Sequence, residues 1–283
     1  MKVNGAQAGT YVEPYAGGAG AALALLFGEH ADRIIINDAD KGIYAMWWAI
    51  LNRTDDFLRL LRDKRISMRQ RDIQHEIYRN PKPHSRTELG FATFYLNRTN
   101  RSGIIVNGGP IGGLKQTGEW GIDARFNKTD LARKIERIAL YRSRIGVFNL
   151  DAIDLLRDVV APEAAKHRIF VYLDPPYYVH GARLYLSYEN HDDHEELRDY
   201  LKSAPFPWIL TYDNAPEIKE LYGRFRQVSF ALAYRAAERR AGKELMIIKR
   251  GLALPKEWAA TVPAKYITTR ERPFAMPAEL TTA

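Results

Sequence analysis

The segment Asp174-Pro175-Pro176-Tyr177 holds several hydrogen-bond acceptors in a fixed arrangement. It directly follows the apolar run Ile169–Leu173, which we predict to be a buried strand. Each proline fixes its backbone torsion and lacks an N–H group, so the neighbouring carbonyls point in set directions. The Asp174 carboxylate and the Pro175 carbonyl could both accept hydrogen bonds from an amino group on an aromatic ring, which would turn the nitrogen lone pair toward a methyl donor. Tyr177 could stack on that ring. The alternative is a structural proline turn, with Asp174 bound to local backbone amides and Tyr177 in the core.

A glycine-rich turn, Glu13-Pro14-Tyr15-Ala16-Gly17-Gly18-Ala19-Gly20, stands between a predicted strand, Thr10–Val12, and a predicted helix, Gly20–Phe27. Glycines in such a turn let a ligand approach the backbone, and the helix N-terminus offers free N–H groups. Leu23 stands where a dinucleotide fingerprint needs its third glycine, so the pattern does not favour hydride transfer. Glu13 could hold a cationic amino acid moiety, and Asp38 could accept both hydroxyls of a ribose. A tight turn with an incidental acid is the alternative.

Both motifs need a scaffold that brings the ends of several strands together. Short apolar runs predict parallel strands at Thr10–Val12, Arg33–Ile36 and Ile169–Leu173, and the first two enclose a helix in a βαβ unit. We therefore predict an α/β fold with a doubly wound, Rossmann-like sheet. Further strands are predicted at Val147–Leu150, Trp208–Tyr212 and Leu245–Lys249, and further helices at His194–Lys202 and Glu217–Gly223.

The stretch 52–144 has a different character from the rest of the chain. Charged, helix-like pieces at Thr54–Lys64 and Leu131–Arg142 flank a glycine-rich middle, Ser102–Gly121. We predict a mostly helical insertion at 52–144, within a main domain formed by 1–51 and 145–251. The proline-containing tail, 252–283, is predicted to be a surface strap or partly disordered.

Composition narrows the classes of protein that fit. The formal net charge of +8 favours polyanionic partners, although it does not identify a site. The chain has no cysteine, which excludes disulfides, thiolate metal sites and cysteine nucleophiles. The N-terminus lacks an apolar signal core, and no apolar run is long enough to cross a membrane, so we expect a cytoplasmic protein without a membrane partner. The cluster His191-Asp192-Asp193-His194 precedes a helix and is interpreted as capping, so no metal is expected.

From Tyr11 to about Arg250 the chain resembles the Dam-type adenine-specific DNA methyltransferases, which carry these motifs in the same order. The resemblance implies S-adenosylmethionine as the cofactor and methylation of the exocyclic amino group of adenine in double-stranded DNA after base flipping. It makes Asp174, Pro175, Pro176 and Tyr177 the catalytic loop and 52–144 the DNA-recognition domain. Cofactor binding would fall to Glu13, Pro14, Tyr15, Ala16, Gly17, Gly18, Gly20, Asn37 and Asp38.

The same resemblance marks residues for DNA binding. Asp151 matches an acid near the target adenine, although it could equally be the N-cap of a helix over Ala152–Val159. The amide and guanidinium groups of the insertion can reach phosphates and base edges, while a solvated helix end and a glycine loop remain the alternative. These insertion residues are Asn97, Arg98, Asn100, Arg101, Ser102, Arg125, Asn127 and Lys128.

Two departures from the family pattern stand out. Arg101 occupies a position where these enzymes commonly have an aromatic residue. The family's aromatic-glycine-lysine segment, upstream of the glycine turn, has no match in Met1–Thr10, so we expect that the chain begins late, that another segment substitutes, or that cofactor binding is weaker. The sequence also bears on two alternative functions. Methylation of glutamine side chains or RNA adenines is disfavoured by Asp174 and by the large basic insertion. A catalytically weak or inactive DNA-binding subunit of a defence or restriction-modification system is favoured only by the missing segment.

Overall fold

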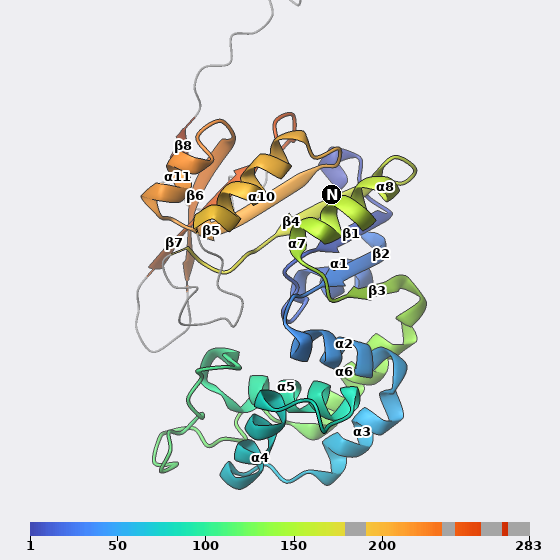
Figure 1. Cartoon of the computed structure of the whole chain (residues 1–283), viewed down its shortest axis with the longest axis vertical. Coiled ribbons are helices and arrows are strands. Elements are labelled where there is room, and N and C mark those ends of the chain that lie inside the picture. Colours follow the sequence, from blue (N-terminus) through green and yellow to red (C-terminus); the bar gives the residue numbers. More distant parts are fainter. Residues whose placement is uncertain (179–190, 234–240, 256–267, 271–283) are drawn as a thin grey trace, which may run out of the picture.

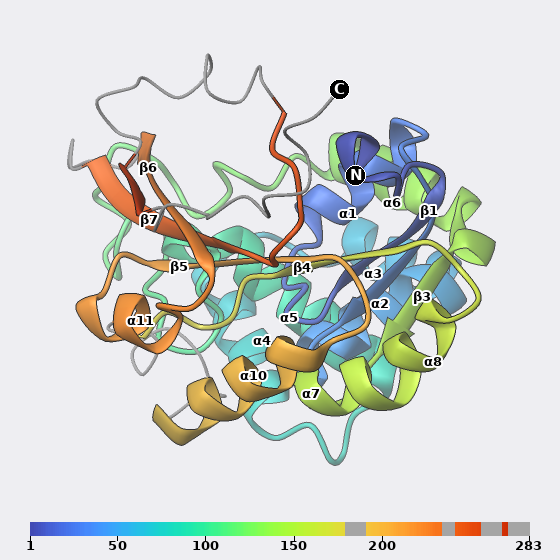
Figure 2. The same cartoon turned by 90° about the horizontal axis from the view of Figure 1, so that it is seen from above.

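The computed structural model describes residues 1–178, 191–233, 241–255 and 268–270. Within these residues, eight strands form one sheet in the order β3-β2-β1-β4-β5-β7-β6-β8, with helices on both faces (Figures 1 and 2). The strands are β1 (Gly9–Glu13), β2 (Ala31–Asn37), β3 (Ile145–Phe148), β4 (Ile169–Leu173), β5 (Trp208–Asp213), β6 (Arg226–Ala233), β7 (Ala241–Ile248) and β8 (Thr268–Arg270).

The sheet is parallel in one part and antiparallel in the other. Strands β3, β2, β1, β4 and β5 pair in parallel, whereas β7 is antiparallel to β5 and β6, and β8 is antiparallel to β6. The predicted α/β sheet is confirmed in this mixed form. The sequence did not predict β6 or β8, and the run expected at Val147–Leu150 begins and ends two residues earlier.

Both faces of the parallel strands are buried, which explains why their sequences are continuous apolar runs. Ile34 and Ile36 belong to a core with α1 (Gly20–Phe27) and α2 (Lys41–Asn52), whereas Ile35 belongs to the opposite core. That second core is closed by α7 (Ala152–Asp154), which continues through a π-helical turn (Leu155–Val160) into α8 (Ala161–Ala164), and by α10 (His191–Ser203) and α11 (Pro216–Leu221) (Figure 2).

Beyond α2, the chain between β2 and β3 forms four helices, α3 (Thr54–Asp63), α4 (Met68–Arg79), α5 (Arg86–Thr99) and α6 (Lys128–Leu140), with a long loop between α5 and α6 (Figure 1). Phe57, Phe91 and Phe94 meet edge to face or tilted among these helices. Their core is continuous with the one beneath α1 and α2. The helices therefore pack on the sheet layer through a shared core, and a separate domain at 52–144 stays a prediction.

Short 3-10 turns and caps complete the described structure. The turns are Lys2–Asn4, Arg101–Gly103 and Arg142–Arg144. Ser85 and Glu88 form a reciprocal capping box at the start of α5. Within the tail that the sequence assigned to a strap, Thr268–Arg270 forms β8, while 256–267 and 271–283 lie outside the described residues. No helix in the described residues is long and apolar enough to span a bilayer.

Candidate active site

A cavity of about 750 Å³ opens at the carboxyl ends of the parallel strands. Open α/β sheets bind ligands where the strand order reverses, and here the order reverses between β1 and β4. Residues that follow β1, β2, β3 and β4 all line the cavity, together with residues of α2, α5 and α10 and of the loop after α5. The topology therefore brings both sequence motifs to one site.

The glycine turn after β1 leaves open space above its backbone. A side-chain carbon placed on Gly17, Gly18 or Gly20 would meet no atom within 4 Å, so the space over the turn is free for a ligand. Gly17 also has φ +45°, a left-handed conformation that glycine adopts without strain. The Trp47 indole donates to the Gly17 carbonyl at 2.9 Å and holds the turn in place.

Asp38, just beyond β2, lies beside this turn on the cavity wall. Its two carboxylate oxygens accept hydrogen bonds from the backbone N–H of Gly17 at 3.0 Å and of Asp40 at 2.9 Å. Burial raises the pKa of Asp38 to about 6, against the opposing effect of these two bonds. The carboxylate is thus fixed in direction and ionised at neutral pH.

Asn37 joins three of the loops that line the cavity. Its amide donates to the carbonyls of Pro14 and Leu150, and its carbonyl accepts from the N–H of Leu150. The side chain is almost fully buried. Asn37 therefore fixes the spacing between the turns after β1, β2 and β3, a task that its sequence position did not reveal.

Glu13 does not line the cavity. It is buried below the glycine turn, where its carboxylate accepts from the Tyr11 hydroxyl at 3.1 Å and from the Ala22 N–H at 2.9 Å. Burial raises its pKa to about 7. In this arrangement Glu13 attaches α1 to β1, and the expected contact with a cationic ligand group has no support from its position.

Asp174 follows β4 and lines the same cavity as Asp38. Its carboxylate accepts a hydrogen bond from the Thr211 hydroxyl of β5 at 2.7 Å. Burial of the group within the protein raises its pKa to about 6, Glu244 adds to the rise, and the Thr211 bond opposes it. Pro176 lines the cavity with Asp174, whereas Pro175 is buried.

The backbone after Asp174 is held by two further strands. The Tyr177 hydroxyl donates to Glu244 of β7 at 3.1 Å, and the Tyr178 N–H donates to Asp213 of β5 at 3.0 Å. Sequence reasoning missed Thr211 and Glu244, because neither belongs to a motif. The only signal for Thr211 was its place as a polar residue within the predicted strand Trp208–Tyr212, and Glu244 directly precedes the predicted strand Leu245–Lys249.

The sequence matches a known protein family. The sequence model of the D12 class N6 adenine-specific DNA methyltransferases matches residues 2–236. The chain belongs to this family. The match covers most of the chain, including both motifs and the helices between them, so the family predicted from the sequence is confirmed and the protein is an adenine-specific DNA methyltransferase.

No curated protein matches the chain. Among solved structures, an uncharacterized protein from Listeria monocytogenes serotype 4b resembles the methyltransferase with 7% sequence identity and a TM-score of 0.36. The likeness covers 90% of this chain and 67% of the other. At that score it supports no conclusion about fold or function.

Asp151 of the methyltransferase combines the two roles considered for it. Its carboxylate accepts from the N–H of Ile153 at 2.8 Å and of Asp154 at 3.3 Å, which is N-capping of α7. It also lines the cavity. Capping thus holds Asp151 at the cavity wall, where a role near a target base stays a prediction.

Most of the predicted DNA-binding side chains have bonds within the protein. Arg98 donates to the Arg125 carbonyl at 2.8 and 3.0 Å, and Arg125 donates in return to the carbonyls of Asn97 and Asn100. Lys128 donates to the carbonyls of Arg62 and Lys64. Burial lowers the pKa of both arginines. The two arginines therefore stabilise the loop between α5 and α6, and Lys128 attaches the start of α6 to the end of α3.

The remaining predicted DNA-binding residues divide into three groups. Asn97 and Ser102 line the cavity. Asn100 is fully buried, and Asn127 is the N-cap of α6. Arg101 is exposed and uses one guanidinium N–H for the Pro110 carbonyl at 3.2 Å. Of the arginines predicted to bind phosphates, Arg101 is the most accessible.

Proposed function

We propose that this chain transfers a methyl group from S-adenosylmethionine to the exocyclic amino group of adenine in double-stranded DNA, with the target base flipped out of the helix. The observation that carries the proposal is that Asp38, the glycine turn and Asp174 line one cavity. A cofactor held by Asp38 and the turn would share this cavity with a base held at Asp174.

The residues present suit that cofactor. The open space over Gly17 and Gly18, which line the cavity, would admit its amino acid portion to the backbone, and Asp38 would accept from its ribose hydroxyls. Pro14, Tyr15, Ala16 and Asn37 would complete this side. When bound, S-adenosylmethionine supplies an activated methyl group on a cationic sulfur.

The charge of the cavity agrees with a cationic ligand. Among the described lining residues there is no lysine or arginine, whereas acidic side chains come from four segments. A cavity of one sign concentrates counter-ions of the other sign and repels like charge. DNA phosphates are therefore expected to bind outside the cavity, on the basic surface of the proposed recognition segment 52–144. The lining acids are Asp38, Asp40, Asp151, Asp154, Asp174, Asp193 and Glu196.

Asp174 would act on the target amino group. At neutral pH its carboxylate is ionised and oriented by Thr211, so it can accept a hydrogen bond from the amino group while the Pro175 carbonyl accepts another. Preorganised acceptors of this kind stabilise the positive charge that develops on the nitrogen as it gains a methyl group. Tyr177 would stack on the flipped base, as aromatic side chains do in base-flipping enzymes.

The decisive experiment replaces Asp174. Asp174→Ala should lower single-turnover methyl transfer to duplex DNA by about 100-fold to 1,000-fold, as loss of one preorganised catalytic group does elsewhere. Asp174→Asn should fall between parent and alanine, because its amide still accepts a hydrogen bond without charge. Cofactor affinity, measured by calorimetry, should stay near the parental value in both variants.

Parental transfer rates in Asp174→Ala would overturn the role of the loop. A parent chain that binds S-adenosylmethionine and DNA but leaves every adenine unmodified would instead support the inactive-subunit alternative. Methylation-sensitive sequencing of DNA from cells that express the chain separates these outcomes.

A further inference from the structure

Helix α4 contacts two walls of the cavity without lining it. Three of its polar side chains, Arg71, His75 and Tyr78, follow one another at intervals of four and three residues, so they lie on one face of the helix. Arg71 and Tyr78 are buried, and His75 is half-buried. A buried polar face of this kind costs desolvation unless each group has a partner, so the partners indicate what the face does.

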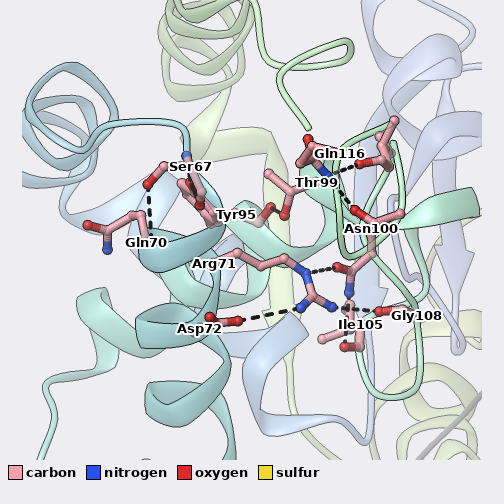
Figure 3. A network of polar contacts seen from close by, with 12 residues as sticks. Ser67, Gln70, Arg71, Asp72, Tyr95, Thr99, Asn100, Ile105, Gly108 and Gln116 are labelled. Carbon is pink, nitrogen blue, oxygen red and sulfur yellow. Dashed lines mark hydrogen bonds and ion pairs between the residues drawn. The ribbon is translucent and has the colours of Figure 1, made fainter. Parts of the chain in front are cut away.

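Arg71 holds the loop between Asn100 and Gly108. Its guanidinium donates to the Asn100 side-chain oxygen at 2.8 Å and to the Gly108 carbonyl at 2.7 Å (Figure 3). The Asp72 carboxylate is 3.8 Å from the Arg71 guanidinium and largely exposed. The Arg71 guanidinium therefore binds both ends of this loop and fixes the loop relative to α4.

Asn100 carries the same restraint into the loop. Its amide donates to the carbonyls of Ile104 at 2.7 Å and Ile105 at 3.3 Å, and no part of the residue is exposed. The loop also contains Ser102 with φ +54°, a conformation that L residues keep only where surrounding contacts impose it. Residues 102–106 form a wall of the cavity. The Arg71–Asn100 pair thus determines the position of that wall.

The rest of the polar face contacts the same loop and the Asp38–Asp40 turn, which also lines the cavity. His75 forms a hydrogen bond with the backbone of Val106, the last residue of the wall. The Tyr78 hydroxyl donates to Asp40. Asp40 caps α2, and its N–H donates to the Asp38 carboxylate at 2.9 Å. One helix face therefore connects the wall 102–106 with the acid proposed to hold the ribose.

We propose that Arg71 is a positioning residue of the methyltransferase, which together with His75 and Tyr78 sets the distance between the wall 102–106 and the Asp38–Asp40 turn and thereby controls cofactor affinity. This inference rests on the proposed function for the identity of the cofactor. Because α4 lies in the predicted DNA-recognition segment, it gives that segment a physical connection to the cofactor site.

The test compares Arg71→Ala with Arg69→Ala, an exposed arginine on the same helix. Arg71→Ala should weaken S-adenosylmethionine binding by about tenfold or more, as loss of hydrogen bonds from a charged group does, and raise the KM for the cofactor with little change in kcat. Arg71→Lys should recover only part, because an ammonium cannot reproduce a two-pronged fork. Arg69→Ala should bind the cofactor like the parent.

Hydrogen exchange of the free protein gives a second measurement that needs no cofactor. Amides of residues 100–108 should exchange faster in Arg71→Ala than in the parent. In Arg69→Ala their exchange rates should equal those of the parent. If Arg71→Ala does not fold, His75→Ala decides the matter, with an expected loss of affinity of about threefold for one neutral hydrogen bond.

Parental exchange and parental cofactor affinity in folded Arg71 and His75 variants would overturn the positioning role. A parent chain that binds no S-adenosylmethionine would overturn the proposed cofactor instead, and the exchange data would still decide whether α4 fixes the loop.

Discussion

Replacing Thr211 by valine removes the hydroxyl that donates to Asp174 at 2.7 Å while preserving the size and branching of a buried side chain. That hydrogen bond favours the ionised carboxylate and opposes the burial that raises the pKa of Asp174 to about 6. Without the bond, the pKa must rise further. If the carboxylate form carries out the reaction, the pH profile of methyl transfer moves to higher pH.

The size of the shift follows from the bond. Hydrogen bonds to charged groups contribute about 1.5–3 kcal/mol, or roughly one to two pKa units. Asp174 faces the solvent of the cavity, so solvent screening places the shift at the lower end of this range, about one pKa unit. The pKa of Asp174 in Thr211→Val is then about 7. At about pH 6.5 the ionised fraction, and with it the rate, would then fall about threefold, whereas at about pH 8.5 parent and variant would differ by only about 3%.

The assay is single-turnover methyl transfer at saturating cofactor and DNA, from about pH 5.5 to about pH 9. Tyr172→Phe is the matched control. It removes the hydrogen bond of 2.9 Å between Tyr172 and the same Thr211 hydroxyl, but it leaves the bond from Thr211 to Asp174 in place. Glu244→Gln should move the midpoint the opposite way, since the Glu244 charge raises the pKa of Asp174. Equal midpoints in the parent and Thr211→Val would refute the reasoning, as would equal shifts in Thr211→Val and Tyr172→Phe.

Three further outcomes are expected. Burial raises the pKa of Glu13 to about 7, so its contribution to stability is present below its unfolded pKa of about 4.3 and is lost as pH rises through about 7. Glu13→Gln should reduce this loss of unfolding free energy, followed by thermal melting across the same pH range, by about 1–3 kcal/mol. An unchanged pH dependence of stability in the variant would contradict this prediction. Asp38→Ala should weaken S-adenosylmethionine binding by about 1.5–3 kcal/mol in calorimetry, and parental affinity in a folded variant would remove Asp38 from the site. DNA affinity should fall steeply with salt, and Arg101→Ala should reduce the slope of log affinity against log salt by roughly one. Arg98→Ala should also lower the melting temperature, because it loses the hydrogen bonds to the Arg125 carbonyl. A flat salt response in the parent would contradict DNA binding through phosphate contacts.

Local patterns in the sequence predicted the elements that carry the two motifs. The bounds predicted for α1 and β4, Gly20–Phe27 and Ile169–Leu173, are those of the structure. Both are short apolar runs with glycine or proline at one end, and such signals involve neighbouring residues only. The order of the motifs, which local reading also supplies, was enough to identify the family that the comparison confirmed.

The antiparallel part of the sheet was beyond such patterns. Strand β7 was predicted as Leu245–Lys249 but begins at Ala241, because its first residues pair with the end of β6. Strand β6 alternates polar and apolar residues around Val228, yet its place beside β7 and β8 depends on partners far along the chain. Pairing, and not the intrinsic preference of the segment, determines these elements.

The sequence by itself determined which residue types stand at the ends of β1, β2 and β4, and hence the chemistry that the site can offer. Only the tertiary structure decided which of those groups face the cavity. Glu13 was expected to bind a ligand, but it lies below the turn and bonds to Ala22, whereas Thr211 and Arg71, which belong to no motif, orient Asp174 and the wall 102–106. The physical reason is that a buried polar side chain must form hydrogen bonds with groups that lie close to it in the folded protein. Packing between segments dozens of residues apart determines which groups those are.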